Sequence, residues 1–393
     1  MCINDWTRRD LFRNAAVVGA AAVGVHTLAA PPVSAKERRF LFGEKIALTN
    51  VRVFDGTALS APRTVVIDNG LIGISALGAR TVDCGGATLL PGLIDAHVHL
   101  ENLGTLEQLT GYGVTTGLDM ATFPASVVRS LRRQPGLTDI RSACTPAVAP
   151  GSLQSQIPGF PANGVVTGPD KAVQFVTARV AEGADYIKII VDNPGLDQAT
   201  VTALTKTAHL FGKQVMGHAT SAAMVESALT AGIDLIHHVP LDTAISAATA
   251  ARYAAKARVA VPTLGMMKGF TQLGIPGMNY EAARGSVAAL RQAGVRILAG
   301  SDANNKPNIP VRPAFGLSLH QELELLVEAG LTPAEALRSA TDLPALSFGL
   351  RDRGVIKPGY RADLVLVDGD PLADIRRTRD IQRVWVGGVE HSA

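Results

Sequence analysis

Between residues 93 and 301 the chain alternates short apolar strands with amphipathic helices, and this repeat constrains the fold more than any other feature of the sequence. Eight strands are expected, at 93–99, 114–120, 139–145, 186–192, 214–219, 234–239, 258–264 and 296–301. The helices between them are clearest at 170–183, 197–211, 221–231, 246–256 and 281–293, where apolar residues recur three or four positions apart. Eight strand–helix units in about 250 residues predict an α/β fold, a (β/α)8 TIM-like barrel. An open, doubly wound sheet is the alternative.

Strand patterns also flank this repeat on both sides. They lie at 46–54, 64–67, 362–367 and 381–386, and turn residues such as Gly and Asp bound them. We infer that the two flanks assemble one small domain. The predicted division is a small β-sandwich domain formed from 36–91 and 350–393, with the barrel spanning 92–349.

The first 35 residues differ from the rest of the chain. Arg8 and Arg9 precede an apolar pair, and a weakly hydrophobic run of Ala, Val and Gly extends from Ala15 to Ala30. Small residues follow at 33–35, where a signal peptidase would cleave. Residues 1–35 are therefore expected to be a twin-arginine-like signal peptide that directs export to the periplasm or the medium. An uncleaved amphipathic tail is the alternative.

The composition allows a large core and argues against some partners. Hydrophobic residues make up 47% of the 393 residues and charged residues 18%, which is atypical of long disordered segments. The net charge is +3 and the basic residues are scattered, so neither nucleic acid nor an anionic membrane is expected as a partner. The expected partner is a small-molecule substrate. A homo-oligomer is compatible with the fold class, since such barrels often pair.

Metal-binding side chains recur at the carboxyl ends of the expected strands, where barrels of this kind carry their active sites. His97 and His99 lie two residues apart at the end of the first strand, so they project from one face and can bind one ion together. The others are Lys188 on the fourth strand, His218 on the fifth, His238 on the sixth and Asp302 after the eighth. Four imidazoles, one amine and one carboxylate at one rim predict a metal centre.

Two neighbours of this set need separate interpretations. Because His238 takes the inward direction, strand alternation is expected to turn His237 toward the helices or a neighbouring strand. Lys188 is flanked by isoleucines, and a buried lysine is costly unless it is paired or modified.

The sequence resembles the amidohydrolase superfamily over nearly the whole chain after the leader. Residues 89–99, Leu-Leu-Pro-Gly-Leu-Ile-Asp-Ala-His-Val-His, look like the first-strand motif of that superfamily, and residues 359–368 look like its terminal motif. The similarity is greater to the imidazolonepropionase-like and prolidase-like branch. One departure is His237, where many relatives carry a glutamate.

The resemblance implies a ligand set. In that branch the counterpart of Lys188 is carbamylated by carbon dioxide and bridges two divalent cations, usually zinc. By this resemblance His97, His99 and Asp302 would hold one cation. His218 and His238 would hold the other, and carbamylated Lys188 would bind both.

Such a centre predicts a metal-dependent hydrolase. Two cations that share a water lower its pKa, and one of them polarises the carbonyl of the substrate. Asp302 is the expected catalytic residue, which takes the proton from the water and passes it to the leaving group. The expected reaction is cleavage of an amide C–N bond in a small molecule, a dipeptide or an N-acyl compound. A lactone, ester or carbamate is the alternative bond, and a catalytically inactive metal-binding barrel is the third hypothesis.

Substrate recognition is expected in the loops. Residues 146–169, rich in Pro, Gly, Ser and Gln, are long enough to cover the barrel mouth as a lid. Residues 264–270 carry Leu, two Met and Phe and indicate a partly apolar pocket. Candidate substrate-binding residues are Lys268, Arg312 and Asn304; for Lys268 and Arg312, ordinary solvated surface is the alternative.

Overall fold

Eight strands lie at the centre of the computed structural model, which describes residues 44–192, 195–307 and 309–391. They are β6 (Leu93–Val98), β7 (Val114–Asp119), β8 (Asp139–Ser142), β9 (Ile187–Ile190), β10 (Val215–His218), β11 (Leu235–His237), β12 (Val259–Val261) and β13 (Arg296–Ile297). Each lies within one of the eight ranges predicted from the sequence. All of their pairings with one another are parallel.

The eight strands close into a barrel. One parallel sheet contains β6, β7 and β8, and a second contains β9 to β13. Two parallel bridges join the sheets, from Val98 to Ala303 at one seam and from Ala147 to Ile189 at the other. Closure at both seams excludes the open, doubly wound sheet and confirms the predicted (β/α)8 barrel.

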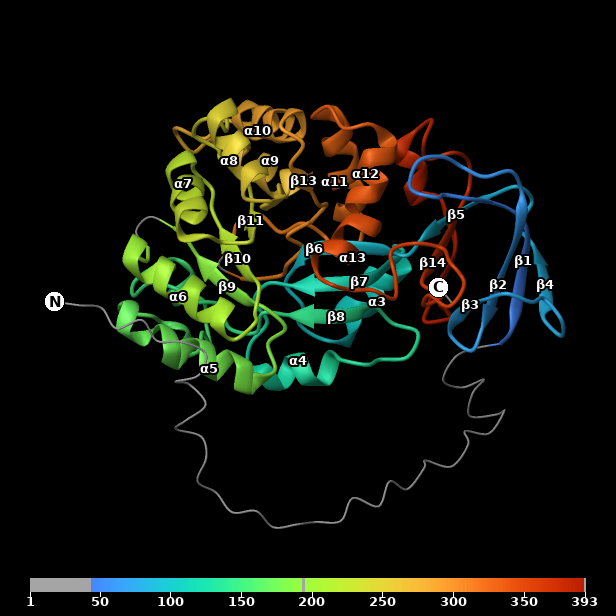
Figure 1. Ribbon diagram of the computed structural model, residues 1–393, viewed down its shortest axis with the longest axis horizontal. Coiled ribbons are helices and arrows are strands. Elements are labelled where there is room, and N and C mark those ends of the chain that lie inside the picture. The colour runs from blue at the N-terminus through green and yellow to red at the C-terminus, as the bar shows by residue number, and fades with distance from the viewer. Residues whose placement is uncertain (1–43, 193–194, 308, 392–393) are drawn as a thin grey trace, which may run out of the picture.

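Helices cover the outside of the barrel (Figure 1). The helix of each strand–helix unit is, in chain order, α3 (Leu103–Gly111), α4 (Ala125–Leu131), α5 (Ala172–Glu182), α6 (Gln198–Leu210), α7 (Ala222–Ala231), α8 (Ala247–Ala255), α10 (Tyr280–Gln292) and α11 (Leu317–Glu328). Additional helices are α9 (Leu264–Thr271), α12 (Pro333–Ser339) and α13 (Asp342–Ser347), and the short 3-10 turns are η1 (Gln154–Gln156), η2 (Ala162–Gly164), η3 (Pro169–Lys171) and η4 (Ile375–Arg379). Helices α5 and α7 end at Gly183 and Gly232, whose φ angles of +88° and +85° favour glycine.

The second unit is a mixed sheet made from both flanks of the barrel. Its strands are β1 (Ile46–Val53), β2 (Arg63–Asp68), β3 (Leu71–Gly73), β4 (Arg80–Asp83), β5 (Thr88–Pro91), β14 (Leu364–Val367), β15 (Ile381–Val386) and β16 (Val389–His391). The flanks join where β5 pairs antiparallel with β14, and Figure 1 shows strands from the two ends of the colour scale together at the right. Along β1, β2 pairs with residues 46–48 and 51, β4 with residues 46–49 and β5 with residues 52–53. The small sheet encloses a core of its own.

Strand β14 shows how the small sheet is attached to the barrel. Leu364 and Leu366 belong to the core inside the small sheet, whereas Val365 and Val367 belong to the main core of the barrel. Neighbouring side chains of a strand point to opposite faces, so β14 is buried on both sides. The small sheet therefore closes its own core and packs on the barrel at the same time.

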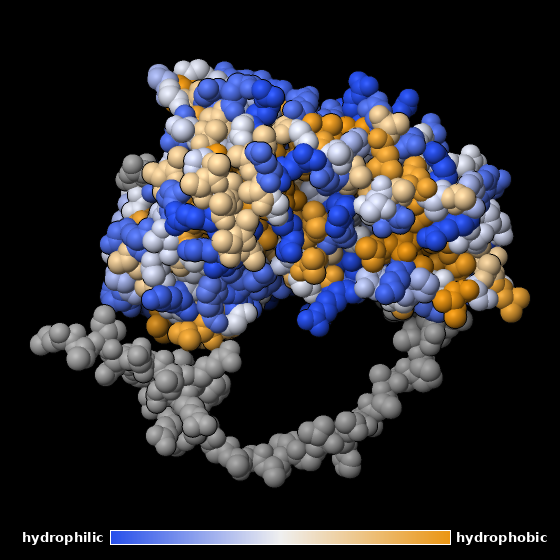
Figure 2. Space-filling view, turned by 45° about the horizontal axis from the view of Figure 1, so that its top comes forward, coloured by the Kyte–Doolittle hydropathy of each residue, from blue (hydrophilic) through white to orange (hydrophobic). Residues whose placement is uncertain are grey.

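Apolar side chains remain exposed on the small domain. Ile74 and Leu77, between β3 and β4, are 89% and 86% exposed. Figure 2 shows orange atoms at the right-hand end of the molecule, over this domain. The homo-oligomer expected from the fold class stays a prediction.

The predicted signal peptide, residues 1–35, lies outside the described residues, as do residues 36–43 of the predicted small domain. Among the helices that the structure describes, none combines the length and apolar character needed to cross a bilayer.

Candidate metal centre

His97, His99 and Asp302 form the best-defined cluster at the carboxyl end of the barrel. Their nearest ligand atoms all lie within 4.8 Å of one another. The Nε2 atoms of His97 and His99 are 3.4 Å and 2.9 Å from the same oxygen, Oδ1 of Asp302. Three donors that converge in this way match the ligand types that bind a divalent cation such as zinc.

Asp95 holds the two chain segments of this cluster together. Its Oδ1 accepts from the backbone N–H groups of His97 at 3.1 Å and Ser301 at 2.9 Å, and its Oδ2 accepts from the Ser301 hydroxyl. Asp95 is fully buried. Burial raises its pKa to about 7, although the hydrogen bonds from Ser301 and His97 act in the opposite direction. Asp95 thus fixes the end of β6 against the segment that carries Asp302.

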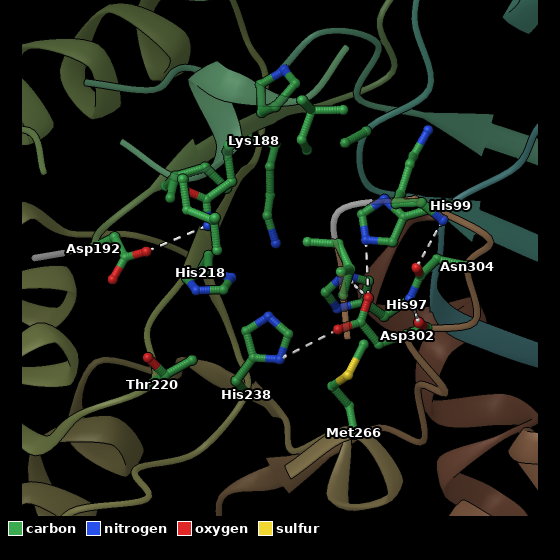
Figure 3. A pocket seen from close by; sticks show the side chains of 18 of the residues that line it. His97, His99, Lys188, Asp192, His218, Thr220, His238, Met266, Asp302 and Asn304 are labelled. Atoms are coloured by element: carbon green, nitrogen blue, oxygen red, sulfur yellow. Dashed lines mark hydrogen bonds and ion pairs between the residues drawn. The ribbon is translucent and has the colours of Figure 1, made fainter. Parts of the chain in front are cut away.

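Lys188, His218 and His238 form the other half of the centre. Figure 3 shows the Lys188 amine reaching between His99 on one side and His218 and His238 on the other. The rings of His218 and His238 are 4.4 Å apart between centroids. Lys188 is buried, and its Nζ has no hydrogen-bond partner in the described structure. A buried amine without a protein partner is unfavourable, so the surroundings of Lys188 fit a group that would pair with it.

Three residues at the strand ends have left-handed backbones. The φ angles of His238, Thr263 and Asp302 are +69°, +48° and +56°. Such angles are uncommon for residues with a side chain, especially a β-branched one, and are typical of functional sites. At His238 the left-handed turn lets two consecutive residues, His237 and His238, both face the barrel interior.

The structure corrects the expectation for His237. Its Nδ1 lies 3.0 Å from Nδ1 of His97, and the two rings are 4.8 Å apart. The side chain therefore packs beside a residue of β6 across the barrel, not toward the helices or a neighbouring strand. This contact engages Nδ1 of His97 and leaves its Nε2 facing Asp302, so His237 orients a residue of the metal cluster.

Burial favours the neutral form of three imidazoles of the site, those of His97, His218 and His238. Burial, assisted by the charge of Lys188, lowers the pKa of His218 to about 4. Burial also lowers the pKa values of His97 and His238 well below the ordinary range. Burial lowers the pKa of Lys188 to about 7, although Asp302 opposes this shift. Neutral imidazoles are the form that binds metals, so the donor set fits divalent cations.

A cavity of about 260 Å³ opens onto this cluster, and all six predicted metal-site residues line it. The predicted lid also lines it: Pro146, Leu153, Gln154, Ile157 and Phe160 come from residues 146–169. Another part of the lining comes from α9 and the loop that follows it, through Met266, Met267, Phe270 and Met278. Residues 146–169 and residues 264–270 thus both line the cavity, as expected. That residues 146–169 cover the mouth as a lid stays a prediction.

Of the three residues predicted to bind the substrate, only one lines the cavity. Asn304 lines the cavity, but its amide donates to the carbonyl of Asp302 and accepts from the N–H of Lys306. Lys268 and Arg312 are not among the lining residues. The Lys268 amine stands 5.7 Å over the Tyr280 ring, and the Arg312 guanidinium donates to the carbonyls of its own loop.

Three residues of the site were not predicted. Lys306 lines the cavity, Asp95 joins β6 to the Asp302 segment, and Thr263 contacts Nδ1 of His238 at 2.7 Å. Asp95 could have been found, because it lies two residues before His97 and therefore shares its face of the strand. Thr263 gives no such signal, since its place follows from a left-handed turn.

Replacing Thr263 by valine is expected to lower metal affinity about 10- to 100-fold, as loss of an orienting partner of a histidine ligand typically does. Valine keeps the branched shape but loses the hydroxyl that contacts His238. Metal titration of the purified variants measures the effect. Thr263→Ser, which keeps the hydroxyl, is the matched control and should bind as the original chain does. Equal affinity of the valine and serine variants would refute the orienting role.

A closed barrel with histidine, aspartate and lysine side chains gathered at the strand ends defines a metal-binding (β/α)8 protein. The model of the Amidohydrolase family matches residues 88–390, most of the chain. The chain therefore belongs to the amidohydrolase family.

Similar proteins match this chain in sequence or in fold. An adenine deaminase from Methylobacterium nodulans is 28% identical over 309 residues, which cover 74% of this chain and 49% of the deaminase. An imidazolonepropionase from Cereibacter sphaeroides is 38% identical over 104 residues, or 26% of this chain and 25% of that protein. The crystal structure of a Xaa-Pro dipeptidase with bound methionine superposes with a TM-score of 0.76 at 24% identity, covering 89% of this chain and all of the dipeptidase. The chain spans about half the length of the adenine deaminase that it resembles.

Proposed function

We propose that the protein is a metal-dependent hydrolase that cleaves an amide C–N bond in a small molecule. The observation that carries this proposal is the buried Lys188 amine, which has no partner and ends between two groups of metal-binding side chains. His97, His99 and Asp302 would hold one divalent cation and His218 and His238 a second. Both cations are proposed to be zinc.

Lys188 would join the two groups as a carbamate. Its neutral amine, favoured by the lowered pKa, would attack carbon dioxide, form an N–C bond and release one proton. The product has two oxygens and one negative charge where the buried amine had no partner. Two oxygens at that point could face both groups of side chains at once.

When bound, the cations lower the pKa of a coordinated water and polarise the carbonyl oxygen of the substrate. Asp302 performs the proton transfer. Its Oδ1 faces His97 and His99, while its Oδ2 lies 3.9 Å from Nδ1 of His238, so its two oxygens point to different partners. Oδ2 is thus available to take a proton from the water and deliver it to the leaving nitrogen. The water oxygen joins the acyl carbon, the C–N bond breaks and the amine leaves protonated.

The similar proteins support a C–N bond as the target, since adenine deaminase, imidazolonepropionase and Xaa-Pro dipeptidase are named for reactions at such bonds. A lactone, ester or carbamate could react at the same centre and remains the second candidate. Retention of all six predicted side chains at one cavity argues against an inactive metal-binding barrel.

The decisive experiment loads the purified chain with zinc in the presence of bicarbonate and follows hydrolysis of matched amides, carbamates, esters and lactones. We expect amide turnover that a chelator abolishes and zinc restores, together with two bound zinc ions per chain by mass spectrometry. A fully loaded chain that cleaves lactones or esters but no amide would move the proposal to the second candidate. A loaded chain that cleaves nothing would favour the inactive barrel.

We further propose that residues 1–35 direct twin-arginine-type export. Replacing Arg8 and Arg9 together by lysine is expected to keep the protein in the cytoplasm as the uncleaved precursor, because the pathway reads the arginine pair. Cell fractionation with immunoblotting measures this. Arg13→Lys, a nearby change outside the pair, is the control. Export of the double variant as efficient as that of the control would contradict the proposal.

A further inference from the structure

Two segments supply most of the large apolar side chains that line the cavity. One is the predicted lid and the other is α9 with its following loop; together they contribute Leu153, Ile157, Phe160, Met266, Met267 and Phe270. Phe123 adds a ring that meets Phe160 edge to face, with the centroids 5.2 Å apart. Outside the metal centre, a bound molecule would therefore touch mainly carbon and sulfur.

The polar side chains that line the cavity are largely engaged with other protein groups. Gln154 donates to the Asp192 carboxylate at 3.3 Å, and both ends of the Asn304 amide are bonded to backbone. The Thr220 hydroxyl contacts the sulfur of Met224 at 3.8 Å. These groups offer few free donors to a substrate; Gln154 Oε1, which has no partner in the described structure, can only accept.

The charges in the cavity do not suit a second anion. Among the described residues, no arginine lines it, and the lysines that do are Lys188 and Lys306. Lys188 belongs to the metal centre. Lys306 is half-buried, with its amine 5.1 Å over the Phe123 ring. A carboxylate in the apolar part of the cavity would thus be desolvated without a buried cation at its side, which is strongly unfavourable.

The rim of the cavity continues the apolar character outward. Leu153 on the lid and Met278 after α9 both line the cavity and are 53% and 37% exposed. Leu273 and Ile275, in the loop that carries Met278, are also exposed. Large apolar side chains around a pocket mark a surface that an apolar ligand covers.

We infer that the substrate is an uncharged amide with an apolar chain or ring of several carbons on the acyl side, and that a free carboxylate on this group is rejected. The inference rests on the proposed amide hydrolysis for its chemistry. Two observations favour an apolar substrate over an anionic one. The lid and α9 line the cavity with apolar side chains, and the described cavity has no buried cation outside the metal centre.

Matched 4-nitroanilides test this with the zinc-loaded full chain. Acetyl, butyryl and hexanoyl 4-nitroanilide form a neutral series, and adipoyl mono-4-nitroanilide has the hexanoyl chain length with a terminal carboxylate. We expect kcat/KM to rise about threefold to fourfold for each added methylene until the cavity is filled. The adipoyl compound should react at least about 100-fold more slowly than the hexanoyl compound.

Two variants in the lid test whether its apolar side chains cause the preference for the hexanoyl over the adipoyl compound. Ile157→Lys places a cation in the apolar wall and should narrow the gap between the hexanoyl and adipoyl compounds at least about tenfold. Gln156→Lys adds the same charge next to it on an exposed residue that does not line the cavity, and should leave the gap unchanged. The inference would be overturned if the adipoyl compound reacted as fast as the hexanoyl compound or faster, and if Lys306→Met abolished this preference. Lys306 would then be the residue that binds the substrate carboxylate.

A binding measurement separates this inference from the proposed function. Asp302→Asn, which should turn over substrate too slowly to disturb the measurement, is titrated with the hexanoyl and adipoyl compounds by calorimetry. Binding of the hexanoyl compound at least about 100-fold more tightly supports the apolar cavity, even if the unsubstituted chain hydrolyses neither compound and the proposed function fails. Equal or tighter binding of the adipoyl compound overturns the inference, even if amide hydrolysis is observed.

Discussion

Asp302→Asn is expected to lower kcat about 10²- to 10⁴-fold, the usual contribution of a general acid–base group. The variant keeps the side-chain shape. It also keeps the hydrogen bond from the backbone N–H of Asp302 to the carbonyl of His97 and the one from the side-chain amide of Asn304 to the carbonyl of Asp302. Asparagine also tolerates the left-handed φ of +56° at this position. The fold should therefore be unchanged, and the loss should be confined to proton transfer and to metal binding.

Steady-state kinetics of the zinc-loaded variant, with metal content and thermal unfolding measured in parallel, checks this result. Asp170→Asn is the matched control, since Asp170 lies on the surface, 71% exposed, beside Lys171. That variant should retain full turnover. Near-normal kcat in Asp302→Asn would assign the proton transfer to another group.

Lys188→Met is expected to abolish turnover and, without metal, to stabilise the protein. Methionine fills the space of the apolar stem but cannot be carbamylated, so the two groups of metal-binding side chains lose their link. In the metal-free chain the amine is buried with no partner, and removing such a group should raise the free energy of unfolding by about 1–3 kcal/mol. Opposite effects on activity and stability at one residue distinguish a functional amine from a structural one.

Urea unfolding of the metal-free chains and metal content of the loaded chains measure the two effects. Lys213→Met is a suitable control, because the Lys213 amine donates to the carbonyl of Ala184 at 2.7 Å. Its loss should lower stability and spare catalysis. If Lys188→Met were active with two bound metals, the carbamate role would be wrong.

The barrel could be predicted because its strands are short apolar runs separated by helices with clear periodicity. The positions at which the strands end were harder to predict. The seventh strand, expected at 258–264, stops at Val261 because Thr263 turns left-handed and the chain enters α9. The sequence of α9 contains Gly265 and Gly269, which disfavour helix. Its first turn is held by Glu322, which accepts from the N–H groups of Leu264 and Gly265 and lies more than fifty residues away.

The metal-binding side chains could be predicted for a related reason. Histidines two residues apart and single polar residues at the ends of apolar strands can be recognised from the local sequence. One general rule, that the carboxyl ends of the strands lie at the same rim of a barrel, then brings them together. His237 could not be placed, because its direction depends on the left-handed turn of His238. Lys268 and Lys306 could not be told apart either. Which of two surface lysines faces a cavity depends on the direction of the helix or loop that carries it.

The pairing of β5 with β14 determines the order in which the barrel and the small sheet can form during translation. Strand β5 ends at Pro91, yet its partner begins at Leu364, so the whole barrel leaves the ribosome before the small sheet can be completed. Until then the edge of β5 that will pair with β14 is open to other strands. A chain that is truncated before β14 would keep the unpaired edge of β5. We therefore expect such a truncated chain to aggregate or to be degraded by proteases. The small sheet therefore forms only after the barrel has been synthesised.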